Sequence, residues 1–515
     1  MKFFNTSGII DPNDHYCVPH RLNHEDLRNL IDTKRYFALH APRQTGKTTE
    51  VIQFIQFLNQ KGHYKALYVN VEAGQSAGAD VEKGMATILE QFRMAIVRTF
   101  GKSDPGLRFF QKPIDYNGSS LQAFLQEWSM VSDKPIVLLI DEIDALLGHT
   151  LLSVLRQLRT GYSERPHAFP QSVCLVGLRD VRDYRFYSKE EKAVINGGSP
   201  FNIKAESLRL GDFSPKEVGD LYAQHTAETG QCFTPEAISY AFYLTQGQPW
   251  LVNALAYEAC FKQVKDRTKT ITKEAIDLAK QSIILRRDTH LDALIDRLKE
   301  SRVQTIMEAV LIGEQASANI PTDDLQYVID LGLLAKREGG LAIANPIYQE
   351  VIPRELTWVT QEMMGIDRLW YKNLDGTIDM VKLLTNFQQF YRDNADQFLA
   401  NFDYKESGPH LLLMAFLQRI INGGGQLIRE YALGRKRIDL LVLWPHPNPI
   451  QRIVIEIKVR KNDKTQAEGI VQTTDYMTHH QATEGHLVIF DRDSNKSWDE
   501  RVWDRQQSNL HVWGV

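Results

Sequence analysis

The feature that most constrains the fold of this chain is the segment Ala41–Thr48, which reads APRQTGKT. The apolar run 36–40 before it predicts a buried strand, and the residues from Lys47 to Leu58 predict a helix with one apolar face. Backbone N–H groups in such a turn, together with the helix N-terminus, form a phosphate-binding site. The segment therefore predicts a phosphate-binding loop in a parallel α/β sheet. Ala41 stands where glycine is usual, and we expect its small side chain to be tolerated.

The residue types in this loop are those that bind a nucleoside triphosphate. Lys47 would neutralise the β- and γ-phosphates, and the Thr48 hydroxyl would bind Mg²⁺. We therefore expect ATP and Mg²⁺ as cofactors. The other loop residues expected to contact the nucleotide are Pro42, Arg43, Gln44, Thr45, Gly46 and Thr49.

A second strand is predicted at 66–70, and two acids follow a third, 136–140, and match the needs of nucleotide hydrolysis. Asp141 would hold Mg²⁺ through water, and Glu142 would position or polarise the attacking water. Arg179 follows a further predicted strand, 172–178, and could sense the γ-phosphate. The alternatives are a switch that binds ATP but hydrolyses it poorly and, for Arg179, a structural arginine.

The segments Pro42–Thr49 and Leu139–Asp144 together resemble the AAA-like, STAND-type ATPases of bacteria. The resemblance covers about the first 360 residues. It implies a helical lid whose Gly-x-Pro segment is Gln246–Asn253, with Pro249 near the nucleotide. It also implies that Tyr16–Pro19 flanks the base and that Asn345–Pro353 ends a winged-helix segment.

Pattern changes divide the chain into five expected domains of an α/β multidomain protein. Helices are predicted in the lid at 215–229, 235–245, 249–264 and 273–286. The acidic helix 323–330 favours an internal spacer over a DNA-reading role for the winged-helix segment. The expected domains are an AAA-like ATPase core with a parallel sheet (1–205), a helical lid (206–290), a winged-helix-like segment (291–360), a helical linker (361–400) and a nuclease-like domain (401–515).

A second candidate site lies near the carboxyl end of the chain. Asp439 falls in a predicted strand, 437–443, and Glu456 falls in the next, 452–459. Lys458 follows Glu456 by two residues, so both side chains project from one face of that strand. Asp439 and Glu456 could bind Mg²⁺ or Mn²⁺, since hard cations prefer carboxylate oxygens. Lys458 could then orient a water or stabilise a phosphate.

The predicted order over the last 115 residues is one helix, three strands, a second helix and a further strand, followed by a last strand at 510–514. This order, together with Asp439, Glu456 and Lys458, resembles the PD-(D/E)XK nucleases, which have a restriction-endonuclease-like α/β fold. The resemblance implies catalytic roles for Glu406, before the first helix, and for Gln472, which shares a helix face with Tyr476. An inactive nuclease-like fold is the alternative, and Glu406 could instead be a helix-start acid. A basic run, Arg435–Arg437, could contact a phosphate backbone.

Composition and charge disfavour several classes of protein. The net charge of −4 disfavours a chain that wraps nucleic acid indiscriminately. Four widely spaced cysteines indicate a reduced protein without a zinc site, and the apolar runs are too short to span a bilayer. Without a signal-peptide pattern at the start, we expect a cytoplasmic protein that does not bind membranes.

Together, these patterns predict an ATP-binding and ATP-hydrolysing switch that controls a Mg²⁺-dependent endodeoxyribonuclease. DNA is the expected substrate, a homo-oligomer would suit double-strand cutting, and defence against foreign DNA rests on the family resemblance alone. Two alternatives stay open. One is a signalling or scaffold ATPase with a non-cleaving terminal domain, and the other is a DNA-remodelling motor.

Overall fold

The protein divides into two compact units, one formed by Met1–Ser282 with Asp330–Gly332 and the other by Ile283–Ile329 with Leu333–Val515. No helix among the described residues has the length and hydropathy to cross a bilayer. The computed structural model describes residues 1–146, 148–179, 185–188, 193–196, 202–286, 289–311, 321–337, 340–356, 370–399, 412–414, 416–417, 424–430, 439–445, 450–460, 462, 464–491, 493 and 496–515.

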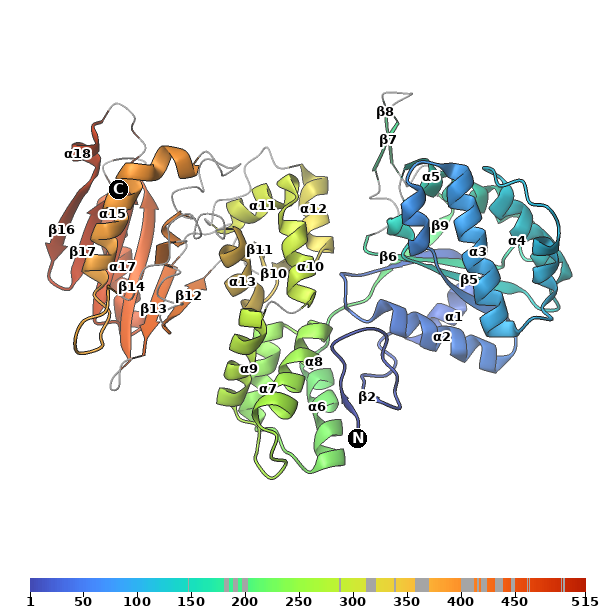
Figure 1. Cartoon of the computed structure of the whole chain (residues 1–515), viewed down its shortest axis with the longest axis horizontal. Coiled ribbons are helices and arrows are strands. Elements are labelled where there is room, and N and C mark those ends of the chain that lie inside the picture. Colours follow the sequence, from blue (N-terminus) through green and yellow to red (C-terminus); the bar gives the residue numbers. More distant parts are fainter. Residues whose placement is uncertain are drawn as a thin grey trace. The chain divides into compact units, whose positions relative to one another are not determined.

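A five-stranded parallel sheet forms the centre of the first unit, with the strand order β4-β5-β6-β3-β9. Alternate side chains along the strands enter two separate cores, as the two-residue period of a strand requires. Helices α1 and α2 cover one face, and α3, α4 and α5 cover the other (Figure 1). The strands are β3 (Tyr36–His40), β4 (Lys65–Asn70), β5 (Ile136–Asp141), β6 (Ser172–Gly177) and β9 (Lys204–Arg209); the helices are α1 (His24–Asp32), α2 (Lys47–Lys61), α3 (Val81–Phe100), α4 (Ser120–Val131) and α5 (Gly148–Gly161).

The sheet confirms the strand predicted at 36–40, and β5 extends the one predicted at 136–140 by one residue. Strand β9 was not predicted. It pairs with β3 and ends at Arg209, beyond the domain boundary that we expected at residue 205. The parallel sheet of a P-loop ATPase-like core is therefore present, with one more strand than the sequence suggested.

Four helices follow the sheet, and three of them begin with a capped, proline-led first turn. Ser214, Thr234 and Gln248 each accept a backbone N–H at the start of a helix. The helix predicted at 249–264 is present, but its last part is a π-helical turn, Glu258–Gln263, that directly follows α8 and in which Val264 N donates to Ala259 O. The helices are α6 (Pro215–Thr229), α7 (Pro235–Thr245), α8 (Pro249–Tyr257) and α9 (Lys273–Arg286).

An N-terminal strap, defined as residues 1–20, packs on these helices. It contains the short parallel strands β1 (Phe3–Phe4) and β2 (His15–Tyr16). Phe4 contacts Tyr222 and His225 of α6, and Trp250 Nε1 of α8 donates to the Thr6 carbonyl at 2.7 Å. The strap thus lies against the helices within the first unit (Figure 1).

The second unit begins with helices and a hairpin. Strands β10 and β11 pair antiparallel. His290 of α10 lies against Tyr348 of α13, both buried. The elements are α10 (Thr289–Leu298), α11 (Ser301–Leu311), α12 (Thr322–Asp330), β10 (Leu334–Arg337), β11 (Gly340–Ile343) and α13 (Pro346–Leu356).

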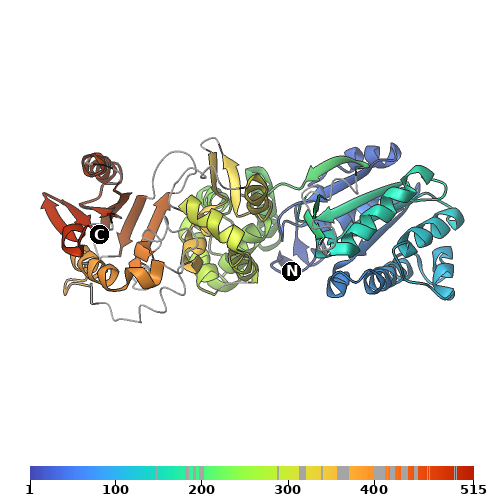
Figure 2. The ribbon, with the colours of Figure 1, turned by 90° about the horizontal axis from the view of Figure 1, so that it is seen from above.

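A six-stranded mixed sheet completes the second unit, with the order β12-β13-β14-β15-β17-β16. Strands β14, β15 and β17 run parallel, and the other neighbours pair antiparallel. Ile470 of α17 packs on Leu487 of β15, while Phe387 of α15 contacts Phe490 of β15, so each helix covers part of this sheet (Figure 2). The elements are α15 (Met380–Leu399), β12 (Gln426–Glu430), β13 (Asp439–Trp444), β14 (Gln451–Val459), α17 (Thr465–His479), β15 (Glu484–Phe490), α18 (Trp498–Arg501), β16 (Trp503–Gln507) and β17 (Leu510–Gly514).

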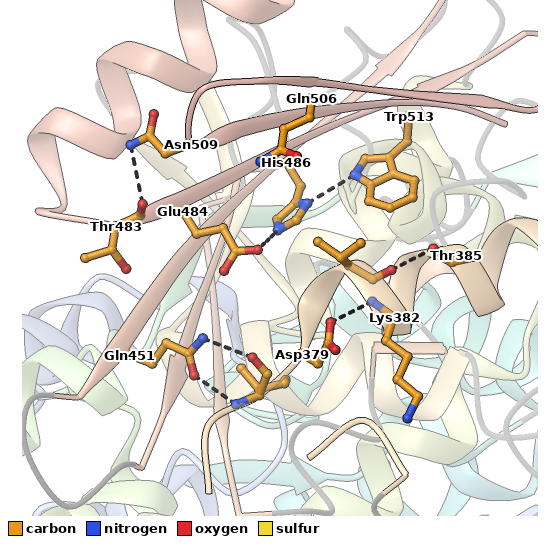
Figure 3. A network of polar contacts seen from close by, with 12 residues as sticks. Asp379, Lys382, Thr385, Gln451, Thr483, Glu484, His486, Gln506, Asn509 and Trp513 are labelled. Carbon is orange, nitrogen blue, oxygen red and sulfur yellow. Dashed lines mark hydrogen bonds and ion pairs between the residues drawn. The ribbon is translucent and has the colours of Figure 1, made fainter. Parts of the chain in front are cut away.

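Buried polar contacts tie this sheet together (Figure 3). Trp513 Nε1 donates to His486 Nδ1 at 3.1 Å, so the other ring nitrogen bears the proton and donates to Glu484 at 2.9 Å. The Gln451 amide pairs with both backbone polar atoms of Ile378. Burial lowers the pKa of His486, which favours its neutral form and a structural role.

Candidate active sites

The phosphate-binding loop has the geometry of an anion site at the start of α2. Gly46 is the N-cap residue and has a left-handed backbone with φ of 88°, which glycine adopts without strain. Gln44, two residues earlier, is also left-handed with φ of 57°. No side-chain hydrogen bond caps the start of α2, so its first N–H groups could bind an anion.

Lys47 is held inside the loop by two backbone carbonyls. Its Nζ donates to Ala41 O at 2.8 Å and to Pro42 O at 3.0 Å. Burial lowers the pKa of the Lys47 ammonium, and the acids Glu142 and Asp141 oppose that effect. An incoming phosphate would offer this buried cation a stronger partner than the two carbonyls.

Asp141 connects three elements at the carboxyl edge of the sheet. Its Oδ2 accepts from Thr48 Oγ1 of α2 at 2.8 Å and from the Tyr68 hydroxyl of β4 at 2.9 Å. Its Oδ1 accepts the Glu142 N–H at 2.9 Å. Asp141 itself is fully buried. The structure therefore brings together Thr48 and Asp141, which are 93 positions apart in the sequence.

Glu142 occupies a strained position directly after β5. Its backbone is left-handed, with φ of 56° and ψ of 39°, a conformation that costs about 1 kcal/mol or more for a residue other than glycine. Burial raises the pKa of its carboxyl, and the neighbouring acids Asp144 and Asp141 raise it further. Strain of this kind is concentrated at functional sites, and a raised pKa suits a group that exchanges a proton with water.

Arg179 lies just beyond the end of β6, on the same edge of the sheet. Its Nε lies 3.5 Å from Oδ2 of Asp330, a residue of the first unit, and the two side chains are 11% and 2% exposed. This ion pair could not be predicted from local sequence patterns, because its members are 151 positions apart. Arg179 therefore has an internal anionic partner at the position where we expected it to sense a γ-phosphate.

Arg21 and Glu50 were missed by the sequence reasoning. The Arg21 guanidinium donates to the Thr45 carbonyl of the loop and to the Gly211 carbonyl after β9, and it stacks 4.7 Å from the Phe213 ring centroid. Burial raises the pKa of Glu50, whose carboxylate accepts the Arg21 N–H at 3.4 Å. Arg21 thus links the loop to the segment that leads into α6.

A cavity opens between the loop, the strap and the start of α8. Thr45 and Gly46 of the loop and Pro249 of α8 all line this cavity. Phe213 N donates to Gly247 O at 2.8 Å, and a side chain at Gly247 would collide with the Phe213 carbonyl. Cys17 and Val18 of the strap also line the cavity, at the place where a nucleotide base was expected.

Magnesium fits the loop site by the chemistry of its side chains. The Thr48 hydroxyl and the Asp141 carboxylate are adjacent oxygen ligands of the kind that Mg²⁺ prefers. Within the described ranges, no three His, Cys, Asp or Glu side chains form a metal-binding group. Mg²⁺ is commonly bound by one or two protein ligands and completes its coordination with water and phosphate oxygens.

The second candidate site is defined by the register of two strands. Asp439 of β13 lies directly opposite Glu456 of β14, and opposed residues of an antiparallel pair share one face of a sheet. Glu456 is fully buried, and its Oε1 lies 3.0 Å from the Lys458 Nζ. The side chain of Asp439 lies outside the described residues. The backbone register therefore places the two carboxyl-bearing positions opposite each other, with Lys458 two residues beyond Glu456 on β14.

The structure describes only some of the other residues predicted for this second site. Gln472 and Tyr476 are half-buried on α17, which packs on β14. The Gln472 Oε1 atom is buried and has no hydrogen-bond partner among the described residues. Glu406 and the basic run Arg435–Arg437 lie outside the described part of the chain.

Several solved structures resemble part of this fold at low similarity. The Walker-type ATPase PABY2304 of Pyrococcus abyssi is 13% identical, with a TM-score of 0.45 over 68% of this chain and 99% of that one. Cdc6p of Pyrobaculum aerophilum is 14% identical, with a TM-score of 0.38 over 70% and 98%. The RuvB Holliday junction branch migration motor of Thermotoga maritima is 13% identical, with a TM-score of 0.33 over 65% and 97%. Similarity at this level supports no inference about activity.

Family membership rests on a different comparison. No curated protein matches the chain. The family model described as the AAA-like domain, however, matches residues 10–353, which is more than half of the sequence and includes the loop, Asp141, Arg179 and Pro249. The chain therefore belongs to the AAA-like domain family.

Proposed function

We propose that this protein is an ATP-binding and ATP-hydrolysing switch whose C-terminal domain cleaves DNA phosphodiester bonds with a divalent metal. The observation that most supports the first half is the convergence of Thr48, Tyr68 and Glu142 on Asp141 beside the buried Lys47. The second half rests on the opposed positions of Asp439 and Glu456 and on the ion pair with Lys458.

ATP would bind with its phosphates on the N–H groups at the start of α2. Lys47 would exchange its two carbonyl partners for the β- and γ-phosphates. Mg²⁺, bound between the nucleotide and the Thr48 and Asp141 oxygens, would neutralise part of the phosphate charge. Glu142, with its raised pKa, would orient the attacking water and accept its proton.

Arg179 would change its partner according to whether the bound nucleotide has a γ-phosphate. A γ-phosphate would compete with the Asp330 carboxylate for its guanidinium, because both are anions that seek the same cation. Asp330 is the last residue of α12, whose preceding residues belong to the second unit. Release of this pair would therefore transmit γ-phosphate binding along the chain toward that unit.

In the C-terminal domain, a nucleic acid phosphate would approach the face of β13 and β14 that includes Asp439 and Glu456. A divalent metal bound by these acids would lower the pKa of a water molecule and stabilise charge on the phosphate. Lys458, which now contacts Glu456, would orient that water or contact a phosphate oxygen. Homo-oligomers would bring two such sites to the two strands of a duplex.

Cleavage of supercoiled plasmid in the presence of Mg²⁺ and ATP tests this proposal. Wild-type protein is expected to nick or linearise the plasmid, and Asp439→Ala and Glu456→Gln to lose about 100-fold or more in rate. Glu468→Gln, on the exposed first turn of α17, serves as a matched control and should cut normally. Cutting that is undiminished in both site variants would remove the assignment.

A second function is favoured by the burial of Glu456. A fully buried carboxylate already paired with a lysine can serve packing alone, in a domain that binds a partner without cutting it. Mn²⁺ titration by calorimetry separates the two readings. Binding that is lost in Glu456→Gln supports cleavage chemistry, whereas an absence of both Mn²⁺ binding and nuclease activity supports the binding domain.

A further inference from the structure

The part of the cavity wall formed by α8 includes the buried amide side chain of Asn253. Asn253, one turn after Pro249, lines the cavity and is only 3% exposed. The same cavity begins at Thr45 and Gly46, where phosphates are expected to bind. A nucleotide with its phosphates on the loop can therefore extend its base between the strap and α8.

The orientation of the Asn253 amide is fixed by one hydrogen bond. Its Nδ2 donates to the Pro249 carbonyl at 2.8 Å, and only the nitrogen end can do so. The oxygen end is therefore Oδ1, which is buried and has no hydrogen-bond donor in the described part of the chain. A buried acceptor without a donor is unfavourable, so a ligand that presents an N–H to it would bind more tightly.

The other surfaces of the cavity suit a flat heterocycle. Val18 of the strap and Pro249 of α8 supply apolar contacts, and Trp250 is anchored by its bond to the Thr6 carbonyl. Apolar walls with one oriented polar group are typical of small-molecule sites, in which the polar group selects among ligands of similar shape.

We propose that Asn253 reads the base, with its Oδ1 accepting a hydrogen bond from the exocyclic 6-amino group of adenine. Guanine presents a carbonyl oxygen at that position, and two acceptors facing each other repel. The inference rests on the proposed nucleotide binding and adds its base specificity, so that the site is selective for adenine nucleotides over guanine nucleotides.

Diphosphates test this role by calorimetry without hydrolysis. The ligands are ADP, its analogue purine riboside diphosphate, which lacks only the 6-amino group, and GDP. Wild-type protein should bind ADP about tenfold or more tightly than either of the others. Asn253→Leu, close to the natural side chain in size, should bind ADP and the analogue with equal affinity, and Asn253→Ala should do the same.

Asn386→Leu is a matched control, because the exposed Asn386 of α15 makes the same bond to the carbonyl four residues earlier but does not line the cavity. It should keep the wild-type preference for ADP. Equal wild-type affinities for ADP and its analogue, or an unchanged ratio in Asn253→Leu, would overturn the proposal even though nucleotide binding stands. A wild-type protein that binds none of the three ligands would instead overturn the proposed function itself.

Discussion

Two fully buried carboxylates, Asp141 and Glu456, show how differently two sheets of one chain can hold an acid. Asp141 ends β5 and is bonded by the hydroxyls of Thr48 and Tyr68, from two other elements. Glu456 lies within β14 and is paired with Lys458 of the same strand. The first acid is thus held by a tertiary arrangement and the second by a local pair.

The difference reflects how the strands are connected. In a parallel sheet the carboxyl ends of successive strands meet at one edge, so the loop and the acid come together by topology. In an antiparallel pair, the facing of Asp439 and Glu456 depends on register, and a slip of one residue would move one acid to the other face. A change of register should therefore separate the two acids of the second site, whereas the first site depends on side chains from several elements.

The largest effect is expected from Lys47→Ala. The substitution removes a buried cation that faces Glu142 and Asp141, and ATP turnover should fall by about 100-fold or more. Steady-state phosphate release measures this. Lys61→Ala, at the exposed end of the same helix, should leave turnover unchanged. Normal turnover by Lys47→Ala would mean that the first site is not the assembled catalytic unit described above.

Neutralising one acid at a time sharpens the comparison. Asp141→Asn should lower ATP turnover by about 100-fold, because a metal ligand is weakened, while leaving the fold of the mixed sheet unchanged. Glu456→Gln should reduce plasmid cleavage and leave ATP turnover within about twofold of the wild type. Both assays are run on both variants. Loss of ATP turnover in Glu456→Gln would show that the two sites are not separable.

A smaller effect is expected at the ion pair of Arg179. Asp330→Asn removes the internal anion that competes with a γ-phosphate, so the affinity for ATP relative to ADP should rise by about three- to tenfold. Competition binding measures the ratio of the two dissociation constants. Asp324→Asn, in the first turn of the same helix, is the control. An unchanged ratio in Asp330→Asn would leave Arg179 as a structural arginine.

The smallest effect is expected in the pH dependence of the stability of the second unit. Burial lowers the pKa of His290 to about 3, whereas an unfolded histidine titrates near pH 6.5. Between those pH values the unfolded state binds more protons than the folded state. The contribution of neutral His290 to the free energy of unfolding is therefore complete above about pH 6.5. Below that pH the free energy of unfolding falls by up to about 1.4 kcal/mol per pH unit.

Urea unfolding of wild type and His290→Gln, from neutral pH to about pH 5, measures this dependence, and His479→Gln on an exposed position is the control. The wild type should lose stability more steeply than His290→Gln as the pH falls. Parallel pH profiles would contradict the assignment of a neutral, buried His290.

Much of the first site could be predicted because its signals are local. The strand before the loop, the helix after it and the acids after β5 each follow from a short run of sequence. The partners Arg21 and Asp330 could not be predicted, because Arg21 reaches the Gly211 carbonyl 190 positions away and Asp330 meets Arg179 across a similar separation. The role of Asn253 could not be predicted either, because the burial of its amide oxygen is a tertiary property.

The mixed sheet was less predictable at its edge. Strand β16 was missed because four of its five residues are exposed, so it lacks the apolar alternation that marks a half-buried strand. Its place in the sheet depends on pairing with β17, a partner that was predicted. The sequence placed Asp439 and Glu456 on successive strands but did not predict their opposed register, and the roles of Asp439, Glu456, Glu406 and Gln472 remain predictions.

The dependence of DNA cleavage on ATP tests most directly whether the nucleotide site controls the C-terminal domain. Plasmid nicking by wild type and by Lys47→Ala is measured with Mg²⁺, with and without ATP, at one protein concentration. A switch predicts that ATP changes the wild-type rate by about fivefold or more and leaves the Lys47→Ala rate unchanged. A wild-type rate that ignores ATP, or an equal response in Lys47→Ala, would contradict control of the C-terminal domain by the nucleotide site.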